Sequence, residues 1–299
     1  MLPSRSSGFT LLEVILVMGL ILMALILLLP ALGSARMAAR RVACMNNGRQ
    51  LGVALQNYHD VYRVFPPGYV ARGVKPTDTA AMESGPGYSW AAMLLPYMDQ
   101  AGLANTINFS ADPVTTAGAT VISTFCCTAE ENAEASYVGC AGVGSLTESP
   151  GAPDGPGVFY RNSFTSIFDV HDGTTHTILV GERATTHDFL SGELPVDAGA
   201  VWLAAIPGQM RPAGVAGDVS ESSATLVLGT VGQDEPFPVR AVHCRTNHVA
   251  AFSSVHPGGA VFVMVDSSTH FLSDDIDVEL YRRLGQRSDG LPAELPESW

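Results

Sequence analysis

Apolar residues fill almost every position from Leu11 to Leu29, and Glu13 is the only charged residue among them. A run of this length matches the roughly 20 residues that an α-helix needs to cross a bilayer. The pattern therefore predicts one membrane-spanning helix over residues 9–29. At about 1.5 Å per residue, a helix that continued to residue 62 would be about 80 Å long.

The helical pattern does continue beyond the apolar run. Pro30 lacks a backbone donor and clashes with the preceding turn, so we expect it to bend the helix. Apolar or small residues then recur at alternating spacings of four and three: Cys44, Gly48, Leu51, Leu55 and Tyr58. Such spacing forms one stripe. It predicts that residues 30–62 are an amphipathic half of the helix that packs on a globular domain.

Residues 63–299 are predicted to form a globular, β-rich ectodomain, because short apolar segments alternate with Gly, Pro, Ser and Asp. The predicted strands are 121–126, 136–140, 177–180, 224–228, 260–265 and 269–272, the last two joined as a hairpin by Asp266-Ser267-Ser268. Residues 90–103 predict a helix broken at Pro96, and Ser273 to Leu284 predict an N-cap and a closing helix. Residues 184–240 are interpreted as an insertion or variable loop region. The predicted fold class is α+β, with a long helix on an antiparallel sheet.

The net charge of −13 argues against a nucleic-acid partner, since phosphate binding depends on clustered Lys and Arg. The basic cluster at residues 36–49 follows the apolar run, where membrane lipid headgroups are the simpler partner. No nucleophile elbow, P-loop, zinc-spacing cluster or dinucleotide fingerprint occurs. The sequence therefore predicts no enzyme and no cofactor.

Placing a carboxylate at the centre of a bilayer costs roughly 2.5 to 3.5 kcal/mol of insertion free energy. Glu13 is therefore expected to lie near a membrane interface or to be paired. The short polar segment 1–8 ends in Gly8, directly before Phe9. This arrangement resembles a type IV prepilin leader. The resemblance implies cleavage between Gly8 and Phe9 by a prepilin peptidase, N-methylation of Phe9, and pairing of Glu13 with a neighbouring subunit during assembly. The alternative is a snorkelling carboxylate in an ordinary signal anchor.

The orientation follows from the same resemblance. Arg36, Arg40 and Arg41 follow the span, so a count of positive charges alone would leave the large domain in the cytoplasm. Long domains translocate with little regard to charge, and a prepilin leader must lie in the cytoplasm. We therefore expect a single-pass inner-membrane protein with a periplasmic ectodomain, or a cell-surface filament.

A second resemblance covers nearly the whole chain. The sequence blocks that carry it are 44–52, 57–60, Phe65-Pro66-Pro67-Gly68, Ser89-Trp90, 94–97, Phe125-Cys126-Cys127, Ser136-Tyr137-Val138-Gly139, 172–182 ending in Gly181-Glu182, and Ser254-Val255-His256-Pro257-Gly258-Gly259. In this order they resemble a planctomycete-type, pilin-like family of unknown function (domain of unknown function 1559). Ser267, His176 and Thr128 stand where that family usually has glycine, asparagine and proline. The resemblance implies architecture and location rather than an activity.

The family block that contains His256 continues to Asp266. A histidine and an aspartate together could form a general-base pair. A strand between the two residues would place them about 20 Å apart, too far for a hydrogen-bonded dyad. The structural interpretation is that Gly258 and Gly259 form an entry turn, Asp266 starts the hairpin turn, and His256 satisfies a loop carbonyl.

Calcium is a second candidate for this end of the chain, where acidic residues gather: Asp274, Asp275, Asp277 and Glu279. Their spacing does not match an EF-hand loop. Helix capping explains the acids as well, so no metal is predicted.

Five cysteines lie after the apolar run, in what should be an oxidising compartment. They are Cys44, Cys126, Cys127, Cys140 and Cys244. The family resemblance implies that Cys44 pairs with Cys127 in a disulfide. A reduced, buried Cys44 on the helix stripe is the alternative.

Together these patterns predict a pilin-like or pseudopilin-like structural subunit of a type II secretion or type IV pilus-like system. Its expected partners are a prepilin peptidase, other pilin or pseudopilin subunits and membrane lipid. Two alternatives stay open. One is an unassembled, membrane-anchored binding module for polysaccharide or secreted cargo, and the other is an anchored hydrolase.

Overall fold

The computed structural model describes residues 10–111, 113, 120–130, 133–153, 155–187, 196–209, 221–231 and 249–291. The chain divides into two compact units, residues 1–40 and 41–299, and each is described by itself. Helix α1 (Leu11–Tyr62) contributes its first part to one unit and its last part to the other.

In the first unit, α1 is a continuous helix that includes Pro30, and its apolar side chains are exposed. It begins with a capping box. The Thr10 hydroxyl accepts from the Glu13 N–H at 3.3 Å, and Glu13 Oε2 accepts from the Thr10 N–H at 2.8 Å. Within the described residues, α1 is the helix that is long and apolar enough to cross a membrane. A signal sequence near an N-terminus has the same property.

In the second unit, the predicted stripe of α1 is buried at Cys44, Gly48, Leu51 and Leu55. Two glycines allow the helix to approach the sheet closely. A Cβ added to Gly48 would lie 3.0 Å from Val263 Cγ2, and one added to Gly52 would lie 2.9 Å from Ser267 Cβ. The remaining buried positions are Gly52, Ala54 and His59, while Tyr58 is half-buried. The stripe is therefore wider than its alternating spacing predicts.

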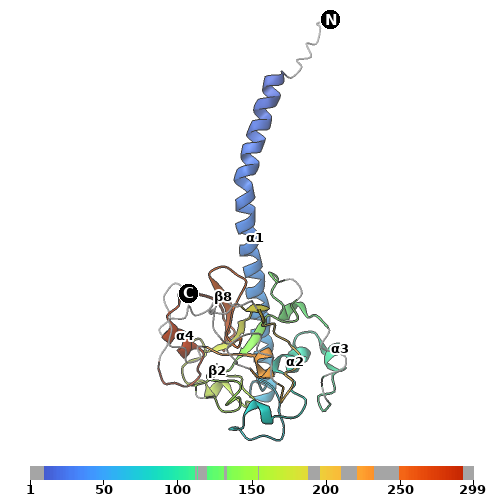
Figure 1. The fold of residues 1–299 in the computed structure, drawn as a ribbon, viewed down its shortest axis with the longest axis vertical. Helices are drawn as coiled ribbons and strands as arrows, with labels where there is room; N and C mark the ends of the chain where they lie inside the picture. Colours follow the sequence, from blue (N-terminus) through green and yellow to red (C-terminus); the bar gives the residue numbers. More distant parts are fainter. Residues whose placement is uncertain are drawn as a thin grey trace. The chain divides into compact units, whose positions relative to one another are not determined.

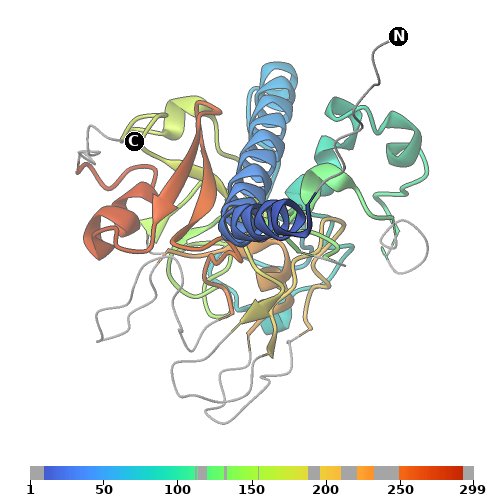
Figure 2. The same ribbon diagram turned by 90° about the horizontal axis from the view of Figure 1, so that it is seen from above.

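The principal sheet of the second unit has the strand order β7-β1-β4-β8-β9. Its strands are β1 (Tyr137–Cys140), β4 (Ile178–Glu182), β7 (Leu228–Gly229), β8 (Gly259–Met264) and β9 (Thr269–Ser273). Neighbouring strands pair antiparallel, apart from the parallel pair β1–β7. In Figures 1 and 2, the part of α1 within this unit runs between the β8–β9 hairpin on one side and the short helices α2 (Trp90–Leu94) and α3 (Ala101–Ala104) on the other. The fold is thus α+β, as predicted.

The other described elements are short. They are α4 (Val278–Leu284), the 3-10 helices η1 (Ala80–Met82), η2 (Leu95–Tyr97), η3 (Ser123–Phe125), η4 (Ile167–Asp169) and η5 (Ser223–Leu226), and the strands β2 (Gly142–Val143), β3 (Gly155–Pro156), β5 (Thr186–His187) and β6 (Val196–Asp197). Strands β2 and β3 pair with each other, as do β5 and β6. Aromatic rings fill the core beside the principal sheet. Trp90 stacks on Phe159 with centroids 5.5 Å apart, and Phe125 stacks on Trp202 at 6.3 Å.

The structure corrects three sequence predictions. Residues 121–126 contain η3 rather than a strand, and residues 224–228 contain most of η5 followed by the start of β7. The closing helix α4 is capped by Asp277, whose Oδ1 accepts from the Leu280 N–H at 2.8 Å, and not by Ser273, which ends β9. The predicted break in the helix at 90–103 is present, because Pro96 lies in η2 between α2 and α3.

Candidate functional site

Four buried side chains meet between α1 and the principal sheet. They are Cys44 on α1, Cys127 just after η3, Glu182 at the end of β4, and His256 in the loop before β8. Their sulfur, oxygen and nitrogen donor atoms all lie within 4.8 Å of one another. We call these four residues the Cys-His-Glu cluster.

The contacts inside the cluster form a chain. Cys44 Sγ lies 2.7 Å from Cys127 Sγ, and Cys127 Sγ lies 3.3 Å from His256 Nε2. The same ring nitrogen, Nε2, lies 3.7 Å from Glu182 Oε1. The two sulfurs and the carboxylate therefore converge on one ring nitrogen.

Backbone hydrogen bonds fix the two cysteines. The Tyr137 hydroxyl donates to the Cys44 carbonyl at 2.7 Å, and the Cys127 N–H donates to Ser136 Oγ at 2.9 Å. Tyr137 begins β1 and Ser136 directly precedes it. The start of one strand thus positions both sulfurs, although Cys44 and Cys127 are 83 positions apart in the chain.

The pairing of β4 with β8 brings Glu182 and His256 together. Glu182 Oε2 accepts from the Val261 N–H and from the Ser254 hydroxyl, each at 2.9 Å. Ser254 Oγ also accepts from the His256 N–H at 3.1 Å. One serine therefore links the carboxylate to the histidine loop.

A buried arginine holds the segment that leads into this loop. Arg183 follows Glu182 and donates to the carbonyls of Ala250 at 2.6 Å, Ala251 at 3.2 Å and Leu228 at 2.8 Å. These bonds help to satisfy buried backbone carbonyls, and the Ala250 carbonyl also accepts from the Thr230 N–H at 3.0 Å. Arg183 is therefore a structural clamp between β7 and the residues before His256.

The electrostatics of the cluster follow from burial and mutual contact. Burial raises the pKa of Glu182 to about 7, and the nearby Cys44 sulfur adds to that shift. Hydrogen bonding with Cys44 raises the pKa of His256, and Glu182 acts in the same direction. The hydrogen bond from Cys127 lowers the pKa of Cys44 to about 4, and the same bond raises the pKa of Cys127. One thiolate therefore forms readily in this pair, whereas the second is difficult to form without a further positive charge.

Comparison with known protein families gives one match. The model of a family described as a protein of unknown function (DUF1559) matches residues 33–279. The chain belongs to this family. Searches of curated proteins and of solved structures gave no match. The DUF1559 match contains the whole Cys-His-Glu cluster, whereas Gly8, Phe9 and Glu13 precede it.

The two cysteines paired by the DUF1559 resemblance are neighbours in the structure, where both are free thiols. The covalent disulfide remains a prediction. Cys126 lies outside the cluster, with its thiol directed at backbone carbonyls that include Ala133 O at 3.2 Å. Cys140 is buried elsewhere, and its thiol donates to the Gly285 carbonyl at 3.6 Å. Cys244 lies outside the described residues.

His256 and Asp266 have different roles. Asp266 Oδ1 accepts from the Ser268 N–H at 2.8 Å within the hairpin turn, beyond the far end of β8 from His256. The expectation that His256 satisfies a loop carbonyl remains a prediction, and its Nε2 faces Cys127 and Glu182. The sequence contained part of the signal for this contact, because Gly181-Glu182 directly follows one predicted strand and His256 precedes another. What it lacked was the information that these two strands are neighbours.

The turn residues of the family blocks have backbone conformations that explain them. Gly258 has φ +85°, and a Cβ added to Gly259 would lie 2.0 Å from the Leu272 carbonyl oxygen. Ser267, which replaces the usual DUF1559 glycine, has φ +70°. A left-handed conformation explains why glycine is usual there.

The remaining predicted residues lie apart from the cluster. Glu13 takes part in the capping box of α1, in addition to the assembly role that the prepilin resemblance implies. Gly8 and Phe9 lie outside the described residues. Among the acids proposed for calcium, Asp277 caps α4, and the Asp274 N–H donates to the Gly258 carbonyl at 3.1 Å.

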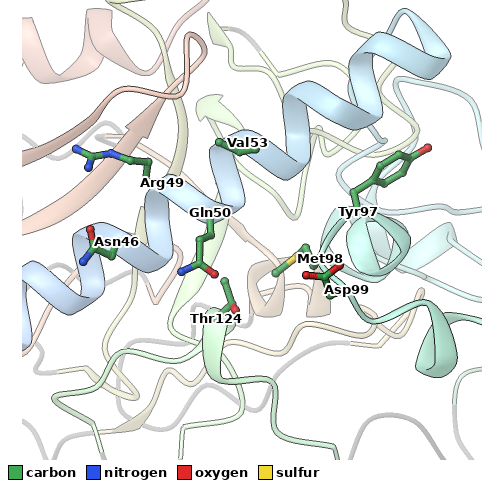
Figure 3. Close-up of a pocket in the computed structure, with 8 residues that line it drawn as sticks. All are labelled: Asn46, Arg49, Gln50, Val53, Tyr97, Met98, Asp99 and Thr124. Atoms are coloured by element: carbon green, nitrogen blue, oxygen red, sulfur yellow. The ribbon is translucent and has the colours of Figure 1, made fainter.

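An open groove of about 540 Å³ lies along the part of α1 in the second unit (Figure 3). Asn46, Arg49, Gln50 and Val53 of α1 form one wall, and Tyr97, Met98, Asp99 and Thr124 form the other. Its lining contains one cation and one carboxylate but no cysteine, serine or histidine. The lining is mainly polar, and it offers no cysteine or serine nucleophile with a neighbouring histidine.

Proposed function

We propose that this DUF1559 protein is a pilin-like structural subunit. A prepilin peptidase would cleave between Gly8 and Phe9, Phe9 would be N-methylated, and the subunit would assemble in a type II secretion or type IV pilus-like system. The observation that carries the proposal is α1, which bears exposed apolar side chains in the first unit and a buried stripe in the second.

Assembly would exchange lipid for protein around the exposed apolar part of α1. Helices in a bilayer associate through packing and polar contacts, because lipid tails are as apolar as leucine. The Glu13 carboxylate would supply one such polar contact, to the amino group of Phe9 on a neighbouring subunit. Before assembly, the capping box with Thr10 satisfies this carboxylate locally. This local partner reduces the cost of holding Glu13 near the membrane.

The capping box also provides the sharpest test. Glu13→Gln retains a side chain that can complete the box, because glutamine serves at this position as glutamate does, but it removes the charge. Glu13→Leu removes both. Membrane insertion is expected for the wild type and both variants. If the charge drives assembly, both variants should be absent from sheared surface material.

The control is the amino terminus of the wild-type chain, read by intact mass and peptide analysis. A chain that begins at methylated Phe9 supports processing. Glu13→Gln assembling like the wild type would mean that Glu13 serves only as a cap. A chain that still begins at Met1 would contradict the proposal as a whole.

The localisation proposed with this function is a single-pass inner-membrane protein with a periplasmic second unit, which becomes part of a cell-surface filament on assembly. Membrane lipid and other pilin subunits are then alternative partners of the same apolar surface. Protease digestion of spheroplasts should remove the second unit, and protection of this unit would place it in the cytoplasm instead.

A second candidate function is an unassembled, membrane-anchored binding module for polysaccharide or secreted cargo. The groove along α1 favours it (Figure 3). Gln50→Trp should fill the groove and abolish ligand retention by the full chain, while Asn57→Trp, at an exposed position of the same helix outside the groove lining, controls for the added ring. Unchanged retention in Gln50→Trp would exclude the groove as the ligand site.

A further inference from the structure

We propose that Cys44, Cys127, Glu182 and His256 bind one Zn²⁺ ion, which fastens α1 to the principal sheet of the second unit. Two cysteines, one histidine and one carboxylate are all ligand types that zinc accepts in four-coordinate tetrahedral sites. The proposal does not depend on filament assembly, so either can fail alone.

The arrangement of the donors is the first argument. Four donor atoms from α1, the segment after η3, β4 and the loop before β8 lie within 4.8 Å of one another. All four side chains are buried. Four buried protein donors would fill all four positions of a tetrahedral ion. This fits a closed structural site rather than a catalytic one, which keeps an open position.

The Glu182 carboxylate is the second, independent argument. The residue is 1% exposed, and its Oε1 has no hydrogen-bond partner among the described residues. Its other oxygen, Oε2, accepts from both Val261 and Ser254. A buried carboxylate oxygen without a donor is costly. A metal-ligating carboxylate is expected to have this pattern, with one oxygen facing the ion and the other held by the protein.

Zinc would offset most of the charge of its own ligands. Two thiolates and one carboxylate carry three negative charges against the two positive charges of Zn²⁺, and the Arg41 guanidinium is close enough to act on His256. Buried charges are tolerated when they are paired or coordinate a metal. Binding would form two Zn–S bonds and break two S–H bonds, releasing both protons to solvent. His256 Nε2 would bind as the neutral ring and Glu182 as the carboxylate.

The ion requires one adjustment. The two sulfurs are 2.7 Å apart, whereas two thiolates about 2.3 Å from a tetrahedral zinc lie about 3.8 Å from each other. An opening of about 1 Å between α1 and the segment after η3 would provide this separation. A Cys44–Cys127 disulfide is the competing state of the same atoms. The two states exclude each other, because sulfurs joined in a disulfide are no longer thiolates.

The first test is the composition of the full chain isolated in detergent from native membranes, without reductant or chelator. Metal analysis is expected to give one zinc per chain, and the intact mass should be that of free thiols at Cys44 and Cys127. A mass lower by two hydrogens, together with a peptide linking the two cysteines and no metal, would overturn the proposal.

The second test uses Co²⁺ alone as a spectroscopic probe on the reduced full chain. One Co²⁺ per chain should give thiolate-to-cobalt charge-transfer absorption and intense visible bands of a tetrahedral site. Cys44→Ser and Cys127→Ser should lose this spectrum, whereas Cys126→Ser and Cys140→Ser should retain it. An octahedral spectrum in the wild type, or no spectrum, would overturn the proposal.

Ser254→Ala provides a variant that leaves every proposed ligand in place. Ser254 donates to Glu182 Oε2 and accepts from the His256 backbone, so its loss should weaken Co²⁺ binding by about 10- to 100-fold. Circular dichroism checks that this variant is folded. Wild-type affinity in folded Ser254→Ala would contradict the assignment of Glu182 and His256 as ligands.

Discussion

The two parts of α1 differ in the pattern of their residues and in the surroundings of their leucines. Leu27 is 66% exposed in the first unit, while Leu51 and Leu55 are fully buried in the second. In the first part nearly all positions are apolar, so no face of the helix is distinguished. In the second part the apolar positions form a stripe and polar residues occupy the rest. A helix that is apolar on all sides fits an apolar environment that surrounds it, such as lipid or packed helices. A helix with one apolar stripe fits a single protein surface.

The largest expected effect tests this difference with the same substitution in both parts. Leu55→Ala should destabilise the second unit by about 2 to 5 kcal/mol, because it leaves a cavity in a packed core. Leu27→Ala should leave the thermal unfolding of that unit unchanged. The measurement is the fluorescence of the buried tryptophans in the full chain in detergent. Equal losses in the two variants would mean that α1 does not differ along its length in this way.

A smaller effect is expected at the glycines. A Cβ on Gly52 would lie 2.9 Å from Ser267 Cβ and 3.0 Å from Val263 Cγ1, whereas one on Gly33 meets nothing within 4 Å. Gly52→Ala should therefore cost about 1 to 3 kcal/mol from overpacking. Gly33→Ala should not destabilise, since alanine is the better helix former. The same unfolding measurement distinguishes them.

Ser267→Gly sharpens the result at Gly52. It removes the nearest contacting atom and a buried hydroxyl that has no hydrogen-bond partner among the described residues. In a double-mutant cycle, the cost of Gly52→Ala should be smaller in the Ser267→Gly background. Additive costs would show that the atoms this variant keeps, Val263 Cγ1 at 3.0 Å and the Cα of residue 267 at 3.1 Å, limit the approach of the helix.

The smallest expected effect concerns pH at the end of α1. Burial lowers the pKa of His59 below its ordinary value of 6.5, and His59 Nε2 accepts from the Ile167 N–H at 3.2 Å. The neutral ring therefore stabilises the fold above that ordinary pKa, and this contribution is lost as the pH falls through the lowered value. The unfolding temperature should drop more between about pH 7 and about pH 5 in the wild type than in His59→Gln. An identical pH dependence in both proteins would exclude His59 as the titrating group.

The parts of the fold that follow from local pattern could be predicted from sequence. The helix to Tyr62 and the β8–β9 hairpin depend on periodicity and turn chemistry, which nearby residues determine. Residues 121–126 were predicted wrongly, because Val121 and Ile122 favour a strand, whereas stacking of Phe125 on Trp202 holds the segment as η3. Tertiary packing overrides propensity in such short segments.

The Cys-His-Glu cluster could be predicted only in part. The family pattern paired Cys44 with Cys127, and the structure places their sulfurs together. Glu182 and His256 join them because β4 and β8 are neighbours in the sheet. Strand order is a long-range property, and the spacing of residues in one sequence does not reveal it. The prediction made from sequence, that His256 satisfies a loop carbonyl, used only the residues near it in the chain.

The contacts of α1 with the sheet have a mechanical consequence. Its buried residues lie on successive turns, from Cys44 through Gly48 and Leu51 to His59. A pull along the helix axis would load these turns in shear and together, rather than peeling them apart one by one. A bound ion or a disulfide at Cys44 would carry the load at the first of these turns. The turns that follow Cys44 would then be loaded only after the bond at Cys44 had broken.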